Sequence, residues 1–439
     1  MVGLLLLLAG CDVPDQIQEV FRDPTSHERY AASLAQAGLD STAAGGDWIG
    51  EGRRALAAPL AVDLPHREDG YLDPVTPTAL GYRFPLRRGQ RLRLDLVRDE
   101  VRPGRLFVDL FRIPGDSTSE LFHELDLPPD SSTLEFDAPR TGDYLLRVQP
   151  ELLRGGAFAL ELRVLPTLAF PVEGRDQGAI LSRFGAERDG GRRQHRGVDI
   201  FAPRGTPVLA AEAGRVTRVD TTNLGGYVVW MTEERGGHRL YYAHLDRQLV
   251  TEGQRVRPGD TLGLVGNTGN ARTTPPHLHF GVYRRGEGAL DPYWFVEPQR
   301  TNVTPADSLA RSLVGAWARA RVDDVVVRAS PSTRGETIER VERGAALQVL
   351  AASETFYRVR MPDGREGYAP QRSLQPATDA LVMLASEPGI PIRVLPSDEA
   401  PLRRRVTDGE SLPVVGLFER YGLVLDERGA EGWVPMAGS

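Results

Sequence analysis

The chain of 439 residues carries a formal net charge of -7, and it contains no lysine, so all 53 basic residues are arginines. At roughly 100 to 200 residues per domain, this length predicts three or four domains. The modest negative charge does not favour nucleic acid as a partner. Because Cys11 is the single cysteine, an intramolecular disulfide and a cysteine-based metal site are both excluded.

The first eleven residues combine a short apolar run with that cysteine. Leu4 to Leu8 is followed by Ala9, Gly10 and Cys11, which is typical of an export signal and too short to span a bilayer as a helix. The Leu-Ala-Gly-Cys ending resembles the bacterial lipobox, and this implies that Cys11 is lipidated and becomes the mature N-terminus. The alternative is the hydrophobic start of a cytoplasmic protein.

Two segments of different character follow. Residues 12–60 are polar with scattered Ala and Leu, and Glu28 to Gly38 has helical spacing that ends in a glycine, so we expect a helical or disordered spacer. Residues 61–166 alternate with period two, most clearly in Arg91 to Leu96, and turn residues separate the alternating runs. This pattern predicts a β-sandwich accessory domain.

Residues 170–298 are again rich in strand patterns and show no sustained helical spacing, which predicts a mostly antiparallel β core with long loops. Residues 303–320 then form a connector. We expect a helix there from Pro305 to Ala320, with Thr304 as its N-cap. Its packed face would consist of Leu309, Leu313, Val314 and Trp317.

An internal repeat occupies the C-terminal part of the chain. Val327-Arg328 matches Ile392-Arg393, and the run Glu366 to Pro370 matches Glu431 to Pro435, with the same offset along the chain in both pairs. A repeated offset of one length predicts two copies of one structural unit. Each copy, at residues 321–376 and 379–437, has the short strands of a small β-barrel and resembles a bacterial Src-homology-3-like domain. Such a barrel would either bind the bacterial cell wall or a partner protein, or be a structural cap without a ligand.

Five of the eight histidines lie between His195 and His279. In a strand, positions i, i+2 and i+4 point the same way, so an extended segment would place His195 and Asp199 on one face across Gly197. His277 and His279 would share a face in the same manner.

Each of these pairs alone is a weak signal, because an isolated His-x-His is more often a surface pair or a hydrogen-bonded core histidine. Their conjunction in one β-rich segment is more specific. Two imidazoles and one carboxylate are a common catalytic zinc set that leaves a fourth position open for water. Zinc lowers the pKa of that water to about 7, and the remaining histidines, including His244, would be free for acid–base work or for holding the oxyanion.

With these residues, the segment resembles the lysostaphin-type (LytM-like) zinc endopeptidases, which cut peptidoglycan cross-bridges. The resemblance implies that His195, Asp199 and His279 bind Zn²⁺, and that His244 and His277 are the catalytic pair that orients the water or stabilises the tetrahedral intermediate. It extends over the whole strand-rich segment and includes the runs Gly214 to Val216, Tyr242 to Leu245 and Gly253 to Gly263.

Some positions depart from the family's pattern. The loop from Gly266 to Pro276 is longer than is usual, Pro275 lies where a glycine is common, and Gly281 lies where a glutamate is frequent. These departures leave the metal set untouched and leave the preferred bond open. Arg193 and Arg196, beside the first ligand, could bind carboxylates of a stem peptide or form part of a solvated loop.

The sequence therefore predicts a mainly β, multidomain lipoprotein: an antiparallel β metallopeptidase core with an N-terminal β-sandwich and two C-terminal small β-barrels. We expect a zinc-dependent endopeptidase that hydrolyses peptide cross-links of peptidoglycan, anchored by lipid to a bacterial membrane and facing the periplasm or cell wall. One alternative is a non-catalytic regulator of other wall hydrolases, although such proteins usually lack some of the five residues. A second alternative is an adhesin or scaffold that binds through the repeats.

Overall fold

The structure, a computed structural model, describes residues 23–98, 104–114, 121–128, 131–188, 190–298, 302–385, 388–425 and 431–436. The predicted export signal with Cys11 and the beginning of the spacer lie outside these residues. Among the helices in the described ranges, none is both long enough and apolar enough to cross a membrane.

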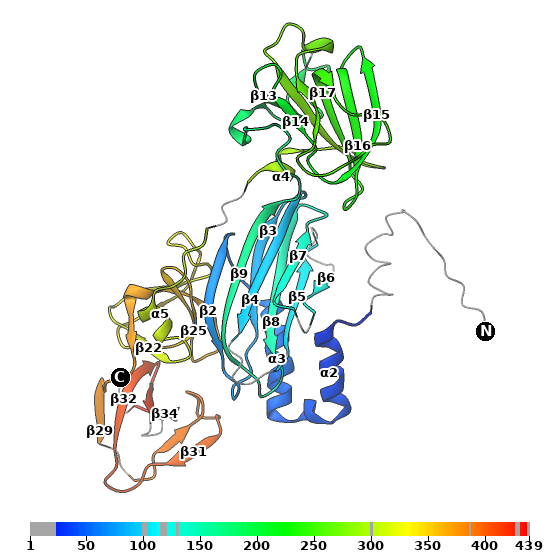
Figure 1. Cartoon of the computed structure of the whole chain (residues 1–439). Helices are drawn as coiled ribbons and strands as arrows, with labels where there is room; N and C mark the ends of the chain where they lie inside the picture. Colours follow the sequence, from blue (N-terminus) through cyan, green and yellow to red (C-terminus); the bar gives the residue numbers. More distant parts are fainter. Residues whose placement is uncertain are drawn as a thin grey trace, which may run out of the picture.

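The predicted mainly β, multidomain architecture with antiparallel sheets is confirmed (Figure 1). A two-sheet sandwich lies in the middle of the molecule, the segment with the histidines packs on one end of it, and the two repeats lie beside it toward the other end. The peptidase-like segment is thereby held apart from both repeats.

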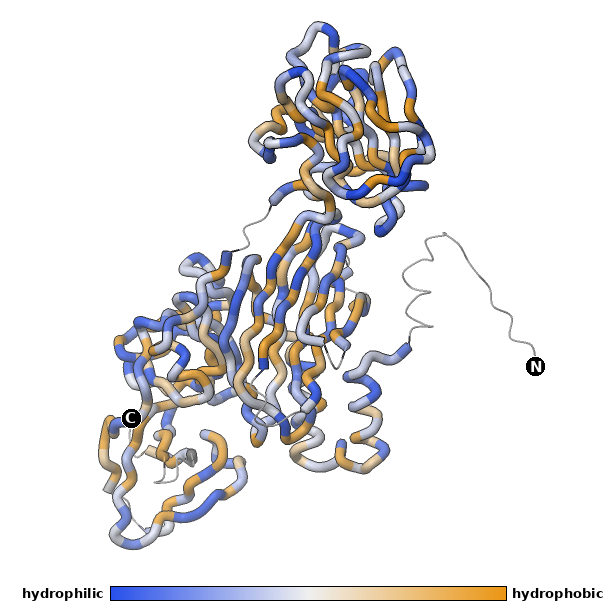
Figure 2. The backbone as a smooth tube through the Cα atoms, in the orientation of Figure 1, coloured by the Kyte–Doolittle hydropathy of each residue, from blue (hydrophilic) through white to orange (hydrophobic). Residues whose placement is uncertain are grey.

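The sandwich buries the apolar side of its alternating strands between two sheets. Leu92 and Leu94 are 0% exposed, whereas Arg93 between them is half-buried on the other side of the strand. Figure 2 shows this alternation of apolar and polar residues along the strands. One sheet has the order β1 (Leu60–Ala61), β3 (Leu80–Leu86), β8 (Gly142–Pro150), β5 (Leu106–Arg112), β6 (Phe122–Asp126). The other contains β2 (His66–Leu72), β9 (Gly156–Pro166), β4 (Gln90–Arg98) and β7 (Thr133–Asp137).

The described part of the spacer is helical and belongs to the sandwich module. Helix α2 (Ser26–Gln36) begins with a capping box at Thr25, and Gly38 follows its end with φ 71°, in agreement with the predicted glycine stop. After the short 3-10 helix η1 (Leu39–Ser41), α3 (Ala43–Ala57) buries Trp48, which is 1% exposed, against the first sheet.

The segment with the histidines forms a separate ten-stranded sheet with its own apolar core. Strands that follow each other along the chain pair in β15–β16, β16–β17 and β20–β21, whereas the central strand β20 also pairs with the distant β13 and with β17. Its elements are the 3-10 helix η2 (Gln177–Ala179), β10 (Ile180–Ser182), β13 (Val198–Phe201), β14 (Pro207–Leu209), β15 (Gly214–Thr222), β16 (Gly226–Glu233), β17 (Arg239–Gln248), β18 (Arg255–Val256), β19 (Thr261–Val265), η3 (Gly269–Ala271), β20 (His277–Arg284), β21 (Gly288–Leu290), the helix α4 (Tyr293–Val296), and the separate hairpin β11 (Glu187–Arg188) and β12 (Arg193–Gln194).

Helix α4 fastens this sheet to the end of the sandwich. The amide of Leu168 donates to the carbonyl of Phe295 over 2.9 Å, and the Arg87 guanidinium lies 4.1 Å from the centre of the Trp294 ring. Gly89, with φ 92°, lets the Phe295 ring approach so closely that a Cβ at this position would lie 2.5 Å from it. The peptidase-like sheet is therefore docked by packing.

The predicted long connector helix was wrong. Only α5 (Ser308–Ser312) is helical, and Asp307, not Thr304, caps it, while the strand β22 (Trp317–Ala320) replaces the predicted last turn. The spacing did not define one buried face, since Leu309 is 77% exposed. Trp317 instead faces the second repeat, so strand pairing with the first repeat overrides helical spacing.

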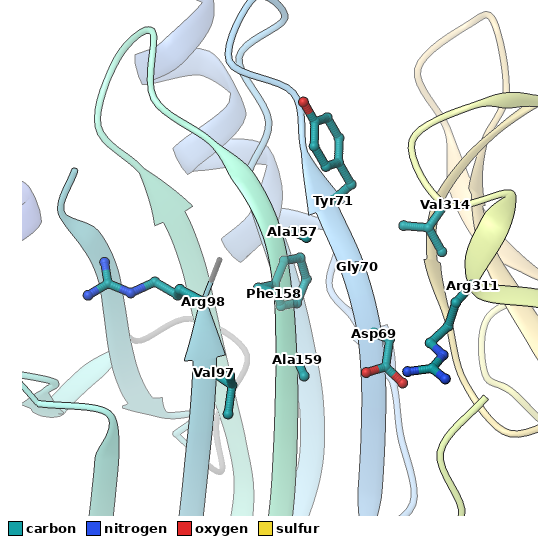
Figure 3. A pocket seen from close by; sticks show the side chains of 10 residues that line it. All are labelled: Asp69, Gly70, Tyr71, Val97, Arg98, Ala157, Phe158, Ala159, Arg311 and Val314. Atoms are coloured by element: carbon teal, nitrogen blue, oxygen red, sulfur yellow. The ribbon is translucent and has the colours of Figure 1, made fainter. Parts of the chain in front are cut away.

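The connector also borders a shallow cavity of about 380 Å³ on the outer face of the second sandwich sheet (Figure 3). Arg311 and Val314 line it from the connector, and Phe158 and Val97 line it from the strands. None of the five predicted site residues contributes to its lining.

The strand register shows the two repeats to be copies of one unit. Arg328 pairs with Tyr368 in the first repeat, and the matching residues of the second, Arg393 and Trp433, pair in the same way. The first consists of β22, β23 (Val325–Arg328), β24 (Thr337–Val341), β25 (Ala346–Ala352), β26 (Phe356–Arg360), β27 (Glu366–Pro370), η4 (Gln371–Ser373) and β28 (Leu374–Pro376). The second consists of β29 (Val382–Ala385), β30 (Pro391–Arg393), β31 (Leu402–Arg405), β32 (Ser411–Phe418), β33 (Tyr421–Leu425) and β34 (Glu431–Pro435).

Both repeats use the same face to pack on the preceding module. In the first, Leu350, Phe356 and Tyr368 join the core of the sandwich. The equivalent residues of the second, Val415, Tyr421 and Trp433, pack against Trp317 and two nearby alanines. The strands continue the contact, because Asp69 and Gly70 of β2 pair with Ala352 and Ala351 of β25.

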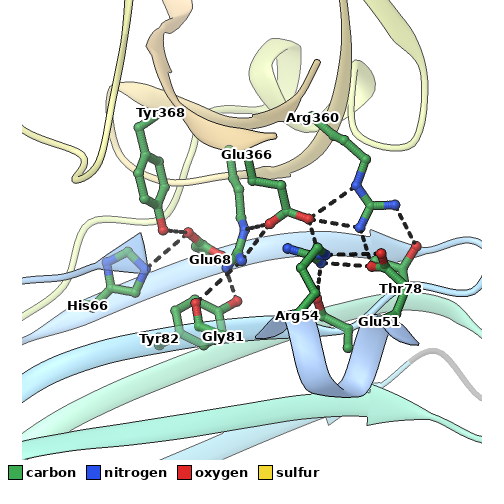
Figure 4. A network of polar contacts seen from close by, with 12 residues as sticks. Glu51, Arg54, His66, Glu68, Thr78, Gly81, Tyr82, Arg360, Glu366 and Tyr368 are labelled. Carbon is green, nitrogen blue, oxygen red and sulfur yellow. Dashed lines mark hydrogen bonds and ion pairs between the residues drawn. The ribbon is translucent and has the colours of Figure 1, made fainter. Parts of the chain in front are cut away.

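The interface between the sandwich and the first repeat contains a buried ionic network (Figure 4). Arg358, which is 0% exposed, lies 2.8 Å from a carboxylate oxygen of Glu366, and Arg54 and Arg360 approach the other oxygen to 2.9 and 2.8 Å. Burial acts to raise the pKa of Glu366, but the three arginines outweigh it and lower the pKa to about 2. Glu68 of the sandwich accepts from the hydroxyls of Tyr82 and Tyr368.

We expect Arg358→Met to detach the first repeat from the sandwich, because the buried carboxylates of Glu366 and Glu68 lose their central cation. Breaking a buried ion pair costs about 3–5 kcal/mol, so the free energy of local opening, measured by hydrogen exchange of the β25–β27 amides, should fall by that amount. Arg340→Met, which breaks the exposed pair with Asp324, is the control and should cost at most about 1 kcal/mol. Equal effects of the two variants would contradict the assigned role of the network.

Candidate functional site

Strand register brings the predicted residues of the site together. Asp199 on β13 lies directly opposite His279 on β20, and Ala243 on β17 lies opposite His279 from the other side. The alternation of the strand sends His277 and His279 to one face, while Leu278 and Phe280, both 0% exposed, enter the core. The apolar core therefore fixes which face carries the polar side chains.

Three of these side chains converge on one point. Oδ1 of Asp199 lies 3.0 Å from Nε2 of His195 and 3.0 Å from Nδ1 of His279, and the two nitrogens are 2.9 Å apart. One ligand atom from each residue lies within 4.8 Å of the others, and His195 and Asp199 are 5% and 6% exposed. This group of three, with His279 half-buried beside the two buried residues, could hold a metal ion.

The backbone around His195 differs from the predicted extended segment. The strand begins only at Val198, and His195 follows the β11–β12 hairpin, where its amide and carbonyl pair with Ala186 and Gly185 over 2.8 Å. A Cβ at Gly197 would lie 2.7 Å from the His279 ring. The glycine therefore permits the close approach of that ring.

His277 and His244 lie beside this group. Nε2 of His277 is 3.9 Å from Oδ1 of Asp199, and the His244 ring centre lies 5.1 Å from that of His277. Nδ1 of His277 lies 2.9 Å from the carbonyl oxygen of Pro275, and Nδ1 of His244 lies 2.9 Å from that of Thr268. Because a carbonyl only accepts, each Nδ1 carries a hydrogen, so in the neutral ring Nε2 is the nitrogen with the lone pair.

His244 occupies an unusual backbone position. Its φ is 62°, in the left-handed region that non-glycine residues rarely adopt, and its amide donates to the carbonyl of Gly225 over 2.7 Å. β17 changes partners here, because Ala243 pairs with β20 while Leu245 pairs with β19. Such local strain is concentrated at functional sites.

The electrostatics of the site act on His244 and Asp199 in opposite ways. Burial, followed by the neighbouring His279 and His277, lowers the pKa of His244 to about 4. Burial acts to raise the pKa of Asp199, but hydrogen bonds from His195 and His279 outweigh it and hold that pKa well below its usual range. At neutral pH His244 is therefore uncharged and Asp199 carries a negative charge, which suits a divalent cation.

Several residues of the site gave no signal in the sequence. Arg188 donates from Nη2 to Oδ2 of Asp199 over 2.6 Å, and the carbonyl of Arg183 holds Nδ1 of His195 at 2.9 Å. A backbone carbonyl leaves no trace in a sequence, and an arginine in an arginine-rich loop is unremarkable. Arg193 and Arg196, predicted to bind substrate, are both exposed next to His195.

A converging pair of imidazoles and a carboxylate, with two further imidazoles beside them on an antiparallel sheet, resembles the donor set of a catalytic zinc site. Residues 193–292 match the model of peptidase family M23, and residues 323–375 match the model of the bacterial SH3 domain. The chain therefore contains an M23 peptidase domain of the LytM/lysostaphin type followed by a bacterial SH3 domain, which confirms the predicted family.

Three relatives illustrate the similarity. The L-Ala–D-Glu endopeptidase of Bacillus subtilis is 37% identical over 136 residues, which are 28% of this chain and 41% of that protein. The peptidoglycan DD-endopeptidase ShyC of Vibrio cholerae is 42% identical over 86 residues, 20% of this chain and 19% of its own length. The uncharacterized lipoprotein YgeR of Escherichia coli is 38% identical over 111 residues, which are 25% of this chain and 41% of that protein. The chain spans less than half the length of each of these relatives.

We expect the group of three, and not the two neighbouring histidines, to determine metal binding. Purified protein should carry one zinc ion per chain, and His279→Ala or Asp199→Asn should lose it, because each removes a converging donor. His277→Ala should retain the metal. Zinc content after dialysis, measured by atomic emission, tests this expectation. A His277→Ala protein without metal would show that the five residues do not divide into three metal ligands and two histidines that leave metal binding unaffected.

Proposed function

We propose that this protein is a zinc-dependent endopeptidase that hydrolyses peptide cross-links of bacterial peptidoglycan. The observation that carries the proposal is the convergence of His195, Asp199 and His279 on one point with His277 and His244 alongside. It lies in an M23 domain, and the relatives of that domain include peptidoglycan endopeptidases.

The donor set fits zinc. Two imidazole nitrogens and one carboxylate oxygen are ligands that zinc prefers, and three protein donors leave one position open. Ligand atoms about 2.05 Å from a tetrahedral ion lie about 3.3 Å apart, and here they lie 2.9 to 3.0 Å apart. A separation this close requires only small movements of the side chains.

Bound zinc would supply a Lewis acid that polarises a carbonyl and lowers the pKa of a water molecule to about 7. The protein's own groups would do the rest. With each Nδ1 held by a backbone carbonyl, Nε2 of the neutral imidazole of His277 or His244 would orient the attacking water and accept its proton. The protonated imidazole can then donate a hydrogen bond to the developing oxyanion or pass the proton to the leaving amine.

Substrate binding involves the surface around the hairpin. Arg193 and Arg196 are exposed beside His195, and guanidinium groups suit the carboxylates of stem peptides. We include both residues as substrate-binding candidates.

We further propose that Cys11 carries a lipid that anchors the protein to a bacterial membrane, with the peptidase facing the periplasm or wall. The Leu-Ala-Gly-Cys ending supports this, as does the similarity to YgeR, which is named a lipoprotein. The sandwich and the repeats would then hold the peptidase at a distance from the anchor and toward its substrate.

The experiment that tests the function uses protein lacking residues 1–11, incubated with isolated peptidoglycan and zinc. We expect new peptide termini in the soluble fragments, identified by mass spectrometry, and their position identifies the bond that is cut. His277→Ala is the matched control, because it should keep the metal and the fold but lose cleavage. Bound zinc without any cleavage by the wild type would instead favour a regulator of other wall hydrolases.

A further inference from the structure

The two carboxylate oxygens of Asp199 have different partners. Oδ1 is the atom that meets both imidazoles, at 3.0 Å from Nε2 of His195 and 3.0 Å from Nδ1 of His279. Oδ2 instead accepts from Nη2 of Arg188 over 2.6 Å. The carboxylate is therefore divided between the metal set and one guanidinium.

The same guanidinium nitrogen also reaches the surroundings of a second ligand. Nη2 of Arg188 donates to Oγ of Ser182 over 2.6 Å, and this hydroxyl lies 3.3 Å from Nδ1 of His195. Ser182 is fixed by strand pairing, because it lies opposite Asp199 where β10 pairs with β13. Arg188 and Ser182 thus link Asp199 to His195 through atoms other than the three that converge.

Arg188 reaches this place from the hairpin that also positions His195. Glu187 and Arg188 of β11 pair with Gln194 and Arg193 of β12, directly before His195. One end of the hairpin thus carries a ligand, and the other carries the arginine that returns to the sheet. The side chain of Arg188 is 35% exposed, whereas that of Asp199 is 8% exposed, so the contact lies at the rim of the site.

We propose that Arg188 is the positioning residue of the metal ligand Asp199. It holds Oδ2 away from the ion, so that Asp199 would bind through Oδ1 alone, and it fixes the hairpin that carries His195 against the sheet. The inference rests on the proposed function, because it assumes that the group of three binds zinc.

Two consequences distinguish this role from simple charge balance. An Asp199 released from Arg188 can turn both oxygens toward the metal and fill the position that a hydrolase leaves open for water. A lysine at position 188 keeps the charge, but it is a compact cation without the planar guanidinium fork, so it holds Asp199 and Ser182 in one geometry less firmly.

The test compares zinc affinity in the wild type, Arg188→Met, Arg188→Lys and the hairpin control Glu187→Ala. Glu187 is exposed and neighbours Arg188 on the same strand. Competition with a chromophoric chelator for Zn²⁺ alone gives the dissociation constants without any substrate. Loss of a partner that orients a metal ligand typically costs 10- to 100-fold, so we expect Arg188→Met to bind zinc about 10- to 100-fold more weakly. The zinc dissociation constant of Arg188→Lys should lie between those of the wild type and Arg188→Met, and that of Glu187→Ala should equal the wild-type value.

A second measurement follows the geometry of the site. The visible absorption of bound Co²⁺ depends on coordination number, so it should change in Arg188→Met and stay unchanged in Glu187→Ala. Equal thermal unfolding midpoints in chelator would show that the variants remain folded. Wild-type affinity and spectrum in Arg188→Met would overturn the role of Arg188, whereas a wild type that binds no zinc would overturn the proposed function itself.

Discussion

The site depends on one constraint, the register in which β20 pairs with β13 on one side and β17 on the other. Because Asp199 and Ala243 both lie opposite His279, a slip of one residue in either pair would turn a converging polar side chain into the core. Leu278, Phe280 and Tyr242 are 0% exposed on the opposite face, and burying any polar alternative there would be costly. The apolar core of the sheet thus specifies the register, and the register specifies which polar side chains converge at the site.

The two repeats show that one docking face can be built with different chemistry. Arg358 and Arg360 of the first repeat correspond to Leu423 and Leu425 of the second, which join an apolar cluster around Trp433. The second repeat packs on the first through aromatic and alanine side chains, so an apolar interface is sufficient to join the two repeats. The first repeat meets Glu68 and helix α3 of the sandwich, so its arginines are matched to carboxylates that only this neighbour offers. Buried ionic contacts add little net stability over apolar ones, and their value here is in defining the partner surface.

Sequence periodicity predicted the large features and failed where tertiary contacts compete with local pattern. Alternation gave the sandwich strands, and the constant offset between the repeats gave the paired positions Tyr368 and Trp433, because both depend on which side chains face a core. The connector helix failed because Trp317 has helical spacing to Leu313, yet it lies in a strand that pairs with β25. The five histidine and aspartate positions could be found from their residue types. Arg188 and the carbonyls of Pro275 and Thr268 could not, since their roles depend on loop paths that no periodicity encodes.

The packing of the repeats also constrains where a wall ligand could bind. Tyr368 and Trp433, the aromatic residues that made the repeat recognisable, are 0% and 2% exposed because each is covered by the preceding module. A ligand for either repeat must therefore meet a different surface, or it must first separate the repeat from the module before it, which for the first repeat means breaking a shared sheet and a buried ionic network. The second route is expensive, since breaking such contacts costs several kcal/mol. The repeats and the sandwich are consequently packed against one another without a break. The packing of Phe295 against Gly89 also attaches the sheet that carries the site to the sandwich.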